Sequence, residues 1–166
     1  FLTFKYAVET ASAAASGPHI VYVDSAHSES LGAAMTTTLA GVIRVVSVNR
    51  AGSDAPLAGA VVGAQATNYN ITIAGAFKAF FYGITLQTGT NTNSTAVLDL
   101  GATDGLHYEY ESCTFTINGS NSNTRIVKFG GAASAFNAYI RFKNCTLNLS
   151  GAAQNVQFGI GVFDFE

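Results

Sequence analysis

The sequence predicts an all-β fold, a parallel β-helix formed as a solenoid by one chain, with a short capping helix near its start. The first observation is a ladder of apolar residues with a step of 29. It comprises Tyr69, Leu98, Val127 and Val156, each followed two positions later by Ile71, Leu100, Phe129 or Phe158. An apolar pair at i and i+2 that recurs at a fixed period is typical of one short strand per solenoid coil. Successive coils then stack and share a core that no single coil can bury alone.

The second observation is another ladder that runs beside the first. It aligns residues 81–86 with residues 110–115 and 142–147. The inward-facing parity changes within each segment, at Gly83, Ser112 or Asn144. Because a shift of one residue moves every later side chain to the other face, we expect a tight bend at these three positions. Each coil therefore has about three short strands, and adjacent coils lie about 4.8 Å apart.

The third coil of this ladder is longer than the one before it. The step from Ile84 to Cys113 is 29 residues, and the step from Cys113 to Cys145 is 32. We place the additional residues at 130–134, where glycine, alanine and serine let a loop bulge without disturbing the core.

Residues 1–16 are predicted to form the capping helix. Phe4, Ala7, Val8 and Ala11 have helical spacing, and Gly17-Pro18 ends the pattern. A short amphipathic helix across the first coil would cover its otherwise open end.

We treat residues 1–166 as one domain. Residues 17–68 form irregular early coils, with strands expected at 19–24, 41–49 and 61–62, loops at 25–30 and 50–56, and an ambiguous stretch at 31–39. Residues 69–166 form the regular coils of about 29 residues, and 161–166 have the character of one more strand.

Composition argues against two classes of partner. The net charge is −2, only 11% of the residues are charged, and the basic residues are scattered, so we expect no nucleic-acid surface. The longest run without charge, residues 55–77, contains a proline, asparagines and glycines. It therefore predicts sheet and turn, and we expect no membrane span.

Cys113 and Cys145 occupy the same inward position in neighbouring coils. Their Cα atoms would lie close enough for a disulfide, but side chains on adjacent parallel strands point the same way. We favour two buried thiols that act as small hydrophobic side chains over a bridge.

Three groups of residues are candidate sites, each with a simpler structural interpretation that we favour. They are Asp24 with His27 and Glu29, His107 with Glu109 and Glu111, and Asp99 with Asp104. The first group has the residue types for a cation site or a shared proton, but these residues are also common in solvated turns. The second alternates with tyrosines as the polar side of one strand would, and the third would need a defined separation across a groove for glycoside hydrolysis. We therefore assign no catalytic, cofactor-binding or metal-binding residue and expect no cofactor.

The opening of the chain resembles pectate-lyase-like right-handed β-helices. A helix, a glycine and Ile-Val-Tyr-Val-Asp at residues 20–24 resemble their start, and Phe-Lys-Asn-Cys-Thr-Leu at 142–147 resembles their turn-and-strand unit. Residues 24–29 and 41–49 make the chain most similar to β-helical virion proteins of tailed bacteriophages, of the capsid-decoration or tailspike type. Polygalacturonase-like members carry adjacent aspartates, Gly-His and Arg-x-Lys. This chain has neither of the first two, Arg125 to Lys128 only approximates the third, and the acidic calcium cluster of the lyases is also absent.

This resemblance implies a structural protein that decorates or cements the capsid surface of a virion, and not an enzyme. The alternatives are a tailspike-type module that binds or cleaves carbohydrate, and a bacterial surface adhesin. We expect a homo-oligomer, with a trimer favoured, and contacts with the major capsid protein or other virion proteins. Outward aromatic residues such as Phe80 and Tyr82 would bind a protein neighbour or a surface carbohydrate.

Overall fold

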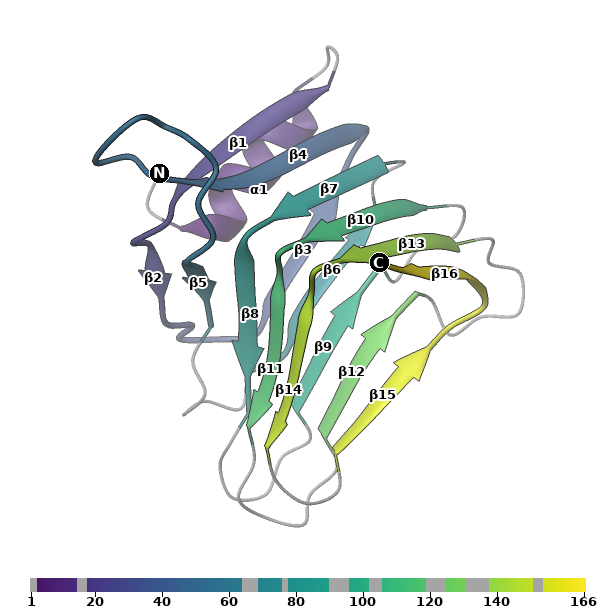
Figure 1. Ribbon diagram of the computed structural model, residues 1–166. Helices are drawn as coiled ribbons and strands as arrows, with labels where there is room; N and C mark the ends of the chain where they lie inside the picture. Colours follow the sequence, from purple (N-terminus) through teal and green to yellow (C-terminus); the bar gives the residue numbers. More distant parts are fainter. Residues whose placement is uncertain are drawn as a thin grey trace.

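A computed structural model describes the chain in nine segments, residues 3–14, 18–63, 69–75, 78–89, 96–101, 106–118, 125–130, 138–150 and 154–166. These segments form three parallel sheets, as the two ladders predict (Figure 1). Sheet A contains β1 (His19–Asp24), β4 (Val42–Val48), β7 (Lys78–Tyr82), β10 (His107–Glu111), β13 (Ala138–Lys143) and β16 (Gly161–Phe165). Sheet B contains β2 (Ser28–Glu29), β5 (Ala60–Val62), β8 (Ile84–Thr88), β11 (Thr114–Asn118) and β14 (Thr146–Ser150). Sheet C contains β3 (Met35–Leu39), β6 (Ile71–Gly75), β9 (Ala96–Leu100), β12 (Arg125–Phe129) and β15 (Gln154–Phe158).

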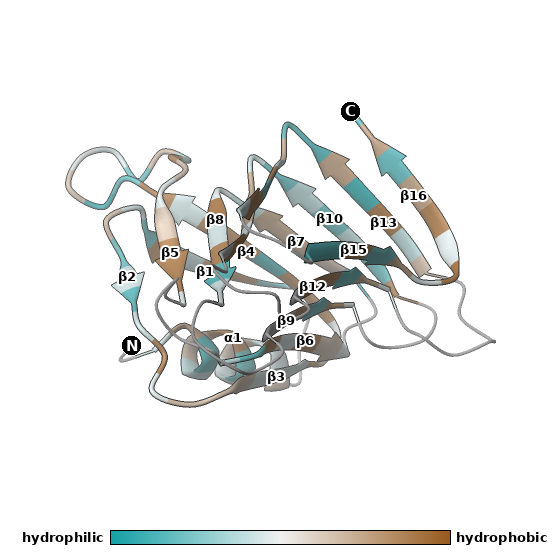
Figure 2. Cartoon of the chain, turned by 90° about the horizontal axis from the view of Figure 1, so that it is seen from below, coloured by the Kyte–Doolittle hydropathy of each residue, from teal (hydrophilic) through white to brown (hydrophobic). Residues whose placement is uncertain are grey.

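The chain visits the sheets in the order A, B, C and then returns to A. The described strands make five such coils, and β16 begins a sixth passage through sheet A. The view from below shows the sheets as separate stacks, with polar and apolar residues alternating along β13 and β16 (Figure 2). Because inward and outward residues alternate, strands of the middle coils such as β7, β8 and β10 give one face to the core and turn the other outward.

The predicted bends lie at the corner between sheets A and B. Gly83, Ser112 and Asn144 all have positive φ, at 67°, 53° and 52°. Their N–H groups donate to the carbonyl oxygens of Glu111, Lys143 and Glu166 in the next coil, at 2.9, 2.9 and 3.0 Å. The bend predicted from the change of parity is thus confirmed. At each of these positions a residue in the left-handed conformation turns the chain, and its N–H group bonds to the next coil.

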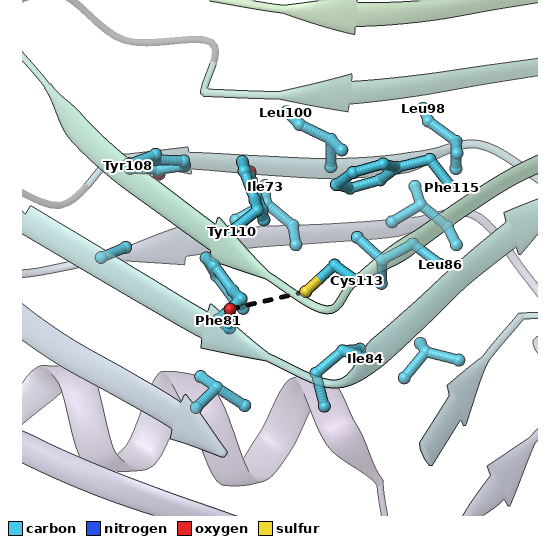
Figure 3. Close-up of a cluster of buried hydrophobic side chains, with 14 of the residues drawn as sticks. Ile73, Phe81, Ile84, Leu86, Leu98, Leu100, Tyr108, Tyr110, Cys113 and Phe115 are labelled. Carbon is cyan, nitrogen blue, oxygen red and sulfur yellow. Dashed lines mark hydrogen bonds between the residues drawn. The ribbon is translucent and has the colours of Figure 1, made fainter. Parts of the chain in front are cut away.

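Aromatic side chains stack along the inside of sheet A. The rings of Phe81, Tyr110, Phe142 and Phe165 follow one another with centroids 5.3, 5.7 and 5.0 Å apart, and each pair is within 16° of parallel. Figure 3 shows the middle of this core, where Ile84, Leu86 and Phe115 from sheet B, with Cys113 just before β11, face Leu98 and Leu100 from sheet C. Stacking across coils keeps equivalent positions aromatic or aliphatic, which is the physical origin of the repeat.

One rung of the predicted ladder is wrong. Leu98 pairs with Ile71, not with Tyr69, and Leu100 pairs with Ile73. Tyr69 precedes β6 and is 37% exposed. A shift of two residues preserves the inward parity, so an i, i+2 pattern cannot distinguish the two registers. The later rungs are confirmed, since Val127 pairs with Leu98 and Val156, and Phe129 pairs with Leu100 and Phe158.

The sheet-C ladder also extends further back than the sequence pattern indicated. Met35 and Thr37, in the stretch that the sequence left ambiguous, pair with Ile71 and Ile73. The additional residues of the longer coil fall between β12 and β13, and residues 131–137 lie outside the described part of the chain.

The N-terminal helix α1 (Phe4–Ala13) begins at Thr3, whose hydroxyl accepts the N–H of Tyr6 at 3.2 Å. Its Phe4, Ala7 and Val8 are buried in the core, and the helix contacts β1, β3 and β4. The apolar face read from the sequence therefore covers the first coil, as expected.

The second coil carries a loop at the corner between sheets A and B, where later coils have only one or two residues between the strands. In residues 49–59, the Asn49 N–H donates to the Ala55 carbonyl at 2.9 Å, and Val48 forms an antiparallel bridge with Pro56. This loop stands beside the outer face of sheet A and forms one wall of the groove described below.

Candidate interaction surface

The outer face of sheet A has two contrasting halves. Its parallel register places side chains of successive coils side by side in a row of Ile20, Arg44, Phe80, Glu109, Arg141 and Asp164, and in a second row of Tyr22, Val46, Tyr82, Glu111 and Lys143. We call Ile20, Tyr22, Arg44, Val46, Phe80 and Tyr82 the aromatic patch. We call Lys78, His107, Glu109, Glu111, Arg141, Lys143, Asp164 and Glu166 the charge ladder.

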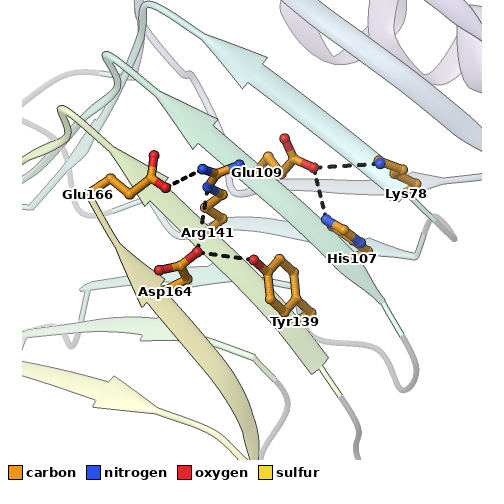
Figure 4. Close-up of polar contacts among 7 residues, drawn as sticks. All are labelled: Lys78, His107, Glu109, Tyr139, Arg141, Asp164 and Glu166. Carbon is orange, nitrogen blue, oxygen red and sulfur yellow. Dashed lines mark hydrogen bonds and ion pairs between the residues drawn. The ribbon is translucent and has the colours of Figure 1, made fainter.

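The charge ladder alternates in sign from coil to coil. Glu109 Oε1 lies 2.9 Å from His107 Nε2 and 3.6 Å from Lys78 Nζ, so β10 carries acids beside a cation of β7 (Figure 4). On the other side, Lys143 Nζ lies 3.0 Å from Glu111 Oε1. Because like charges at sheet spacing repel, this alternation lets outward charges share adjacent strands.

The last part of the ladder is centred on Arg141. Its Nε lies 3.6 Å from Asp164 Oδ2, its Nη2 donates to Glu166, and the Tyr139 hydroxyl donates to Asp164 at 3.1 Å (Figure 4). The hydrogen bond to Glu166 raises the pKa of the Arg141 guanidinium, so this cation remains charged at any physiological pH. These pairs are partly exposed and individually weak, so they order the surface more than they stabilise it.

The aromatic patch lacks this mutual pairing. Ile20 is 50% and Tyr22 57% exposed. The Arg44 guanidinium lies 4.6 Å from the centroid of the Phe80 ring, a cation–π contact, and has no ion pair among the described residues. An exposed cation on an apolar, aromatic surface is a composition that protein interfaces favour.

A groove of about 370 Å³ crosses the patch. It is lined by Ile20, Tyr22, Arg44, Val46, Pro56, Phe80, Tyr82 and Glu111. A hollow of about 90 Å³, lined in part by Phe80, Glu109 and Lys143, adjoins it. The groove combines aromatic walls with a guanidinium and a carboxylate, and its volume is in the range of small-ligand sites.

The structure brings only two of the three side chains of the first sequence-predicted group into contact. His27 Nε2 lies 3.3 Å from Glu29 Oε2, but the Asp24 carboxylate accepts the N–H of Ala26 at 2.9 Å and closes its own turn. Glu29 Oε2 also accepts the N–H of Phe4 at 2.6 Å. Glu29 therefore satisfies a free donor in the first turn of α1, and its main role is to hold the helix against the first coil.

The second group lies together on β10 and belongs to the charge ladder. Its burial pattern alternates along the strand, which confirms one strand with a polar outer side. In the third group, Asp99 points outward from β9 and pairs in register with Lys128 on β12. Burial raises the pKa of the Asp99 carboxyl and the nearby Lys128 ammonium opposes this shift. Asp104 lies outside the described residues, so the structure gives no separation between the two aspartates of the predicted pair.

Cys113 and Cys145 are free thiols, as the sequence favoured, but only Cys113 is buried and Cys145 is partly exposed. Cys113 Sγ contacts the Phe81 carbonyl at 3.5 Å, and Cys145 Sγ contacts the Tyr110 carbonyl at 3.3 Å. A hydrogen bond from Cys113 lowers the pKa of the Cys145 thiol to about 7, whereas burial raises the pKa of Cys113 well above its ordinary value.

Sequence reasoning identified Phe80, Tyr82, Glu109 and Glu111 as outward residues but missed their partners. Arg141 lies 32 residues after Glu109, the same step that separates Cys145 from Cys113. Extending that step to the outward positions would have predicted the opposite charges on β13.

No family model, curated protein or solved structure matches this chain. The described residues include no helix that is long and apolar enough to cross a membrane. Within the same residues, no cluster of three or more histidine, cysteine or acidic side chains is arranged to hold a metal ion.

Proposed function

We propose that this chain is a structural protein of a tailed-bacteriophage virion and that it decorates or cements the capsid surface. In this proposal the outer face of sheet A attaches the protein to a virion neighbour such as the major capsid protein. In the same proposal the coils wind in the right-handed sense, which parallel crossover connections adopt almost without exception.

The observation that carries the proposal is the aromatic patch. Arg44 lies over Phe80 on a surface that includes the exposed Tyr22, while the neighbouring charge ladder is internally paired. Tyrosine and arginine are enriched among the residues that dominate binding energy in interfaces. A sheet built from stacked coils keeps these side chains in fixed positions and so lowers the entropy cost of binding.

Immunogold labelling of purified virions with an antibody against this chain tests the location. Gold on the capsid surface supports the proposal, and purified virions of the unaltered phage that carry no copy of the chain contradict it. The surface is tested by adding purified variants to particles that lack the protein. Arg44→Glu and Phe80→Ala should abolish attachment, whereas Thr85→Ala on the outer face of sheet B should leave it unchanged.

A carbohydrate-binding module is the second candidate, and the groove is the observation that favours it. Tyr82 offers a ring for a sugar face, and Glu111 and Arg44 offer hydrogen-bonding groups in the same groove. Glycan-array binding that is lost in Tyr82→Ala, together with no attachment to particles, would favour this function over capsid attachment.

A further inference from the structure

The strand β1 is the first edge of sheet A. Its one ladder partner among the described strands is β4. The N–H of Ser25 donates to the Val48 carbonyl at 2.8 Å, which shows that the backbone groups of the odd-numbered residues here point toward β4. Because these groups alternate along a strand, the N–H and C=O groups of Ile20 and Tyr22 point away from the sheet.

Only a short part of this edge is available for pairing. The Asp24 carbonyl accepts the N–H of His27 at 2.9 Å and is therefore occupied by its own turn. Beside Ile20 and Tyr22 the edge borders a groove of about 560 Å³, whose other side includes Phe4, Ala7 and Ala11 of α1. The helix covers the core, and among the described residues no backbone hydrogen bond outside the sheet reaches Ile20 or Tyr22.

We propose that a second copy of this chain pairs with β1 in antiparallel orientation about a twofold axis at Val21. In this register Ile20 of one copy lies opposite Tyr22 of the other, and the reverse pair follows by symmetry. Each such pair exchanges two backbone hydrogen bonds, so four bonds satisfy the outward groups of both copies. A twofold contact uses the same residues on both copies, as the most common closed assemblies do.

The side chains fit the same register. Ile20 and Tyr22 are half-exposed on the outer face of sheet A, at 50% and 57%. Across the twofold axis they form two cross-strand pairs of a β-branched and an aromatic residue, which stabilise antiparallel strands. Exposed edge strands are often protected against pairing with another chain by a lysine or a proline, and β1 has neither.

This inference does not depend on the virion proposal, and it replaces the trimer expected from the sequence with a dimer. The purified chain is measured by light scattering and mass photometry across a concentration series from micromolar to millimolar. A dimer whose fraction rises with concentration supports the inference. A monomer throughout, or a trimer, overturns it.

Variants assign the contact to β1. Ile20→Lys adds a charge to the edge and Tyr22→Pro removes an outward N–H group, so both should give monomers. Thr85→Ala, on the outer face of sheet B, should still give dimers. Circular dichroism and thermal melts check that each variant folds, and a dimer that survives both edge substitutions contradicts the proposal.

Hydrogen exchange of the unsubstituted chain gives an independent readout. The amides of Ile20 and Tyr22 should exchange more slowly as the concentration increases, while the Ser25 amide, already bonded within the chain, should not change. Equal exchange of Ile20 and Tyr22 at all concentrations would exclude pairing at this edge.

Discussion

Equivalent inward residues of the fourth and fifth coils differ greatly in exposure. Phe115 on β11 is 2% exposed, whereas its neighbour in the ladder, Leu147 on β14, is 41% exposed. In sheet C, Phe129 is 2% exposed and its partner Phe158 is 47% exposed. The residues are similar in chemistry and occupy the same position in the repeat.

The difference shows that burial in this fold depends on the neighbouring coils. A residue in the fourth coil is covered from both sides, but in this structure the fifth coil has only β16 above part of it. The free energy of a repeat protein is close to a sum of coil and interface contributions. The same substitution should therefore have very different effects in the two coils.

The largest expected difference is between Phe129→Ala and Phe158→Ala. Phe129 packs edge-on against Phe115 at 5.0 Å and Phe142 at 4.7 Å between ring centroids, so its truncation leaves a cavity. We expect a loss of about 3–5 kcal/mol in the free energy of unfolding. Phe158 is half-exposed, and its truncation should cost only about 1 kcal/mol, half of a full transfer from water. Urea unfolding of both variants measures the two values, and equal losses would show that coil position does not control the cost.

A smaller difference is expected between Gly83→Ala and Gly41→Ala. Both glycines have positive φ, 67° and 64°. A Cβ at Gly83 would lie 2.7 Å from Ala58 Cα, whereas nothing lies within 4 Å of a Cβ at Gly41. The left-handed conformation alone should cost about 1 kcal/mol at Gly41, and the clash should raise the cost at Gly83 to roughly 2–3 kcal/mol. Thermal melts provide the comparison, and a Gly41 variant that is the less stable of the two would contradict it.

The repeat in the sequence predicts the regular coils well because stacked positions must share polarity. It also predicts the corner at Gly83, Ser112 and Asn144, because a change in the parity of inward residues has few structural causes other than a bend. It fails at Tyr69, where a two-residue shift leaves the parity intact. Register in that coil is determined by the lengths of its turns, which an apolar pattern does not record.

The candidate surface is less predictable than the fold. Outward residues can be polar or apolar, so they leave no repeating pattern in the sequence. Arg44 and Phe80 can therefore be placed side by side only once the register of β4 and β7 is known. That register spans the irregular loop of residues 49–59, which interrupts the repeat. The charge ladder was easier to predict from the sequence, because β10 and β13 belong to the regular coils and the repeat gives their register.

The smallest predicted effect is chemical and compares the two thiols. Cys145 lies in the more open coil, and the hydrogen bond from Cys113 stabilises its thiolate and lowers its pKa to about 7. Its thiolate fraction therefore rises as the pH increases through about 7, below the ordinary thiol value of about 8.5. Alkylation by iodoacetamide, followed by mass spectrometry, should show half-maximal reaction of Cys145 near that pH. Cys113, which is buried and has a raised pKa, should react only after unfolding.

The variant Cys113→Ala separates the hydrogen bond from general exposure. Without the Cys113 donor, the midpoint of Cys145 alkylation should move up toward the ordinary thiol value, because the thiolate loses its strongest stabilising contact. The matched control is Thr114→Ala, at the outward position next to Cys113, which should leave the midpoint in place. If Cys113→Ala and the unsubstituted chain give the same profile, then exposure alone sets the reactivity of Cys145, and the two coils differ in access but not in thiol chemistry.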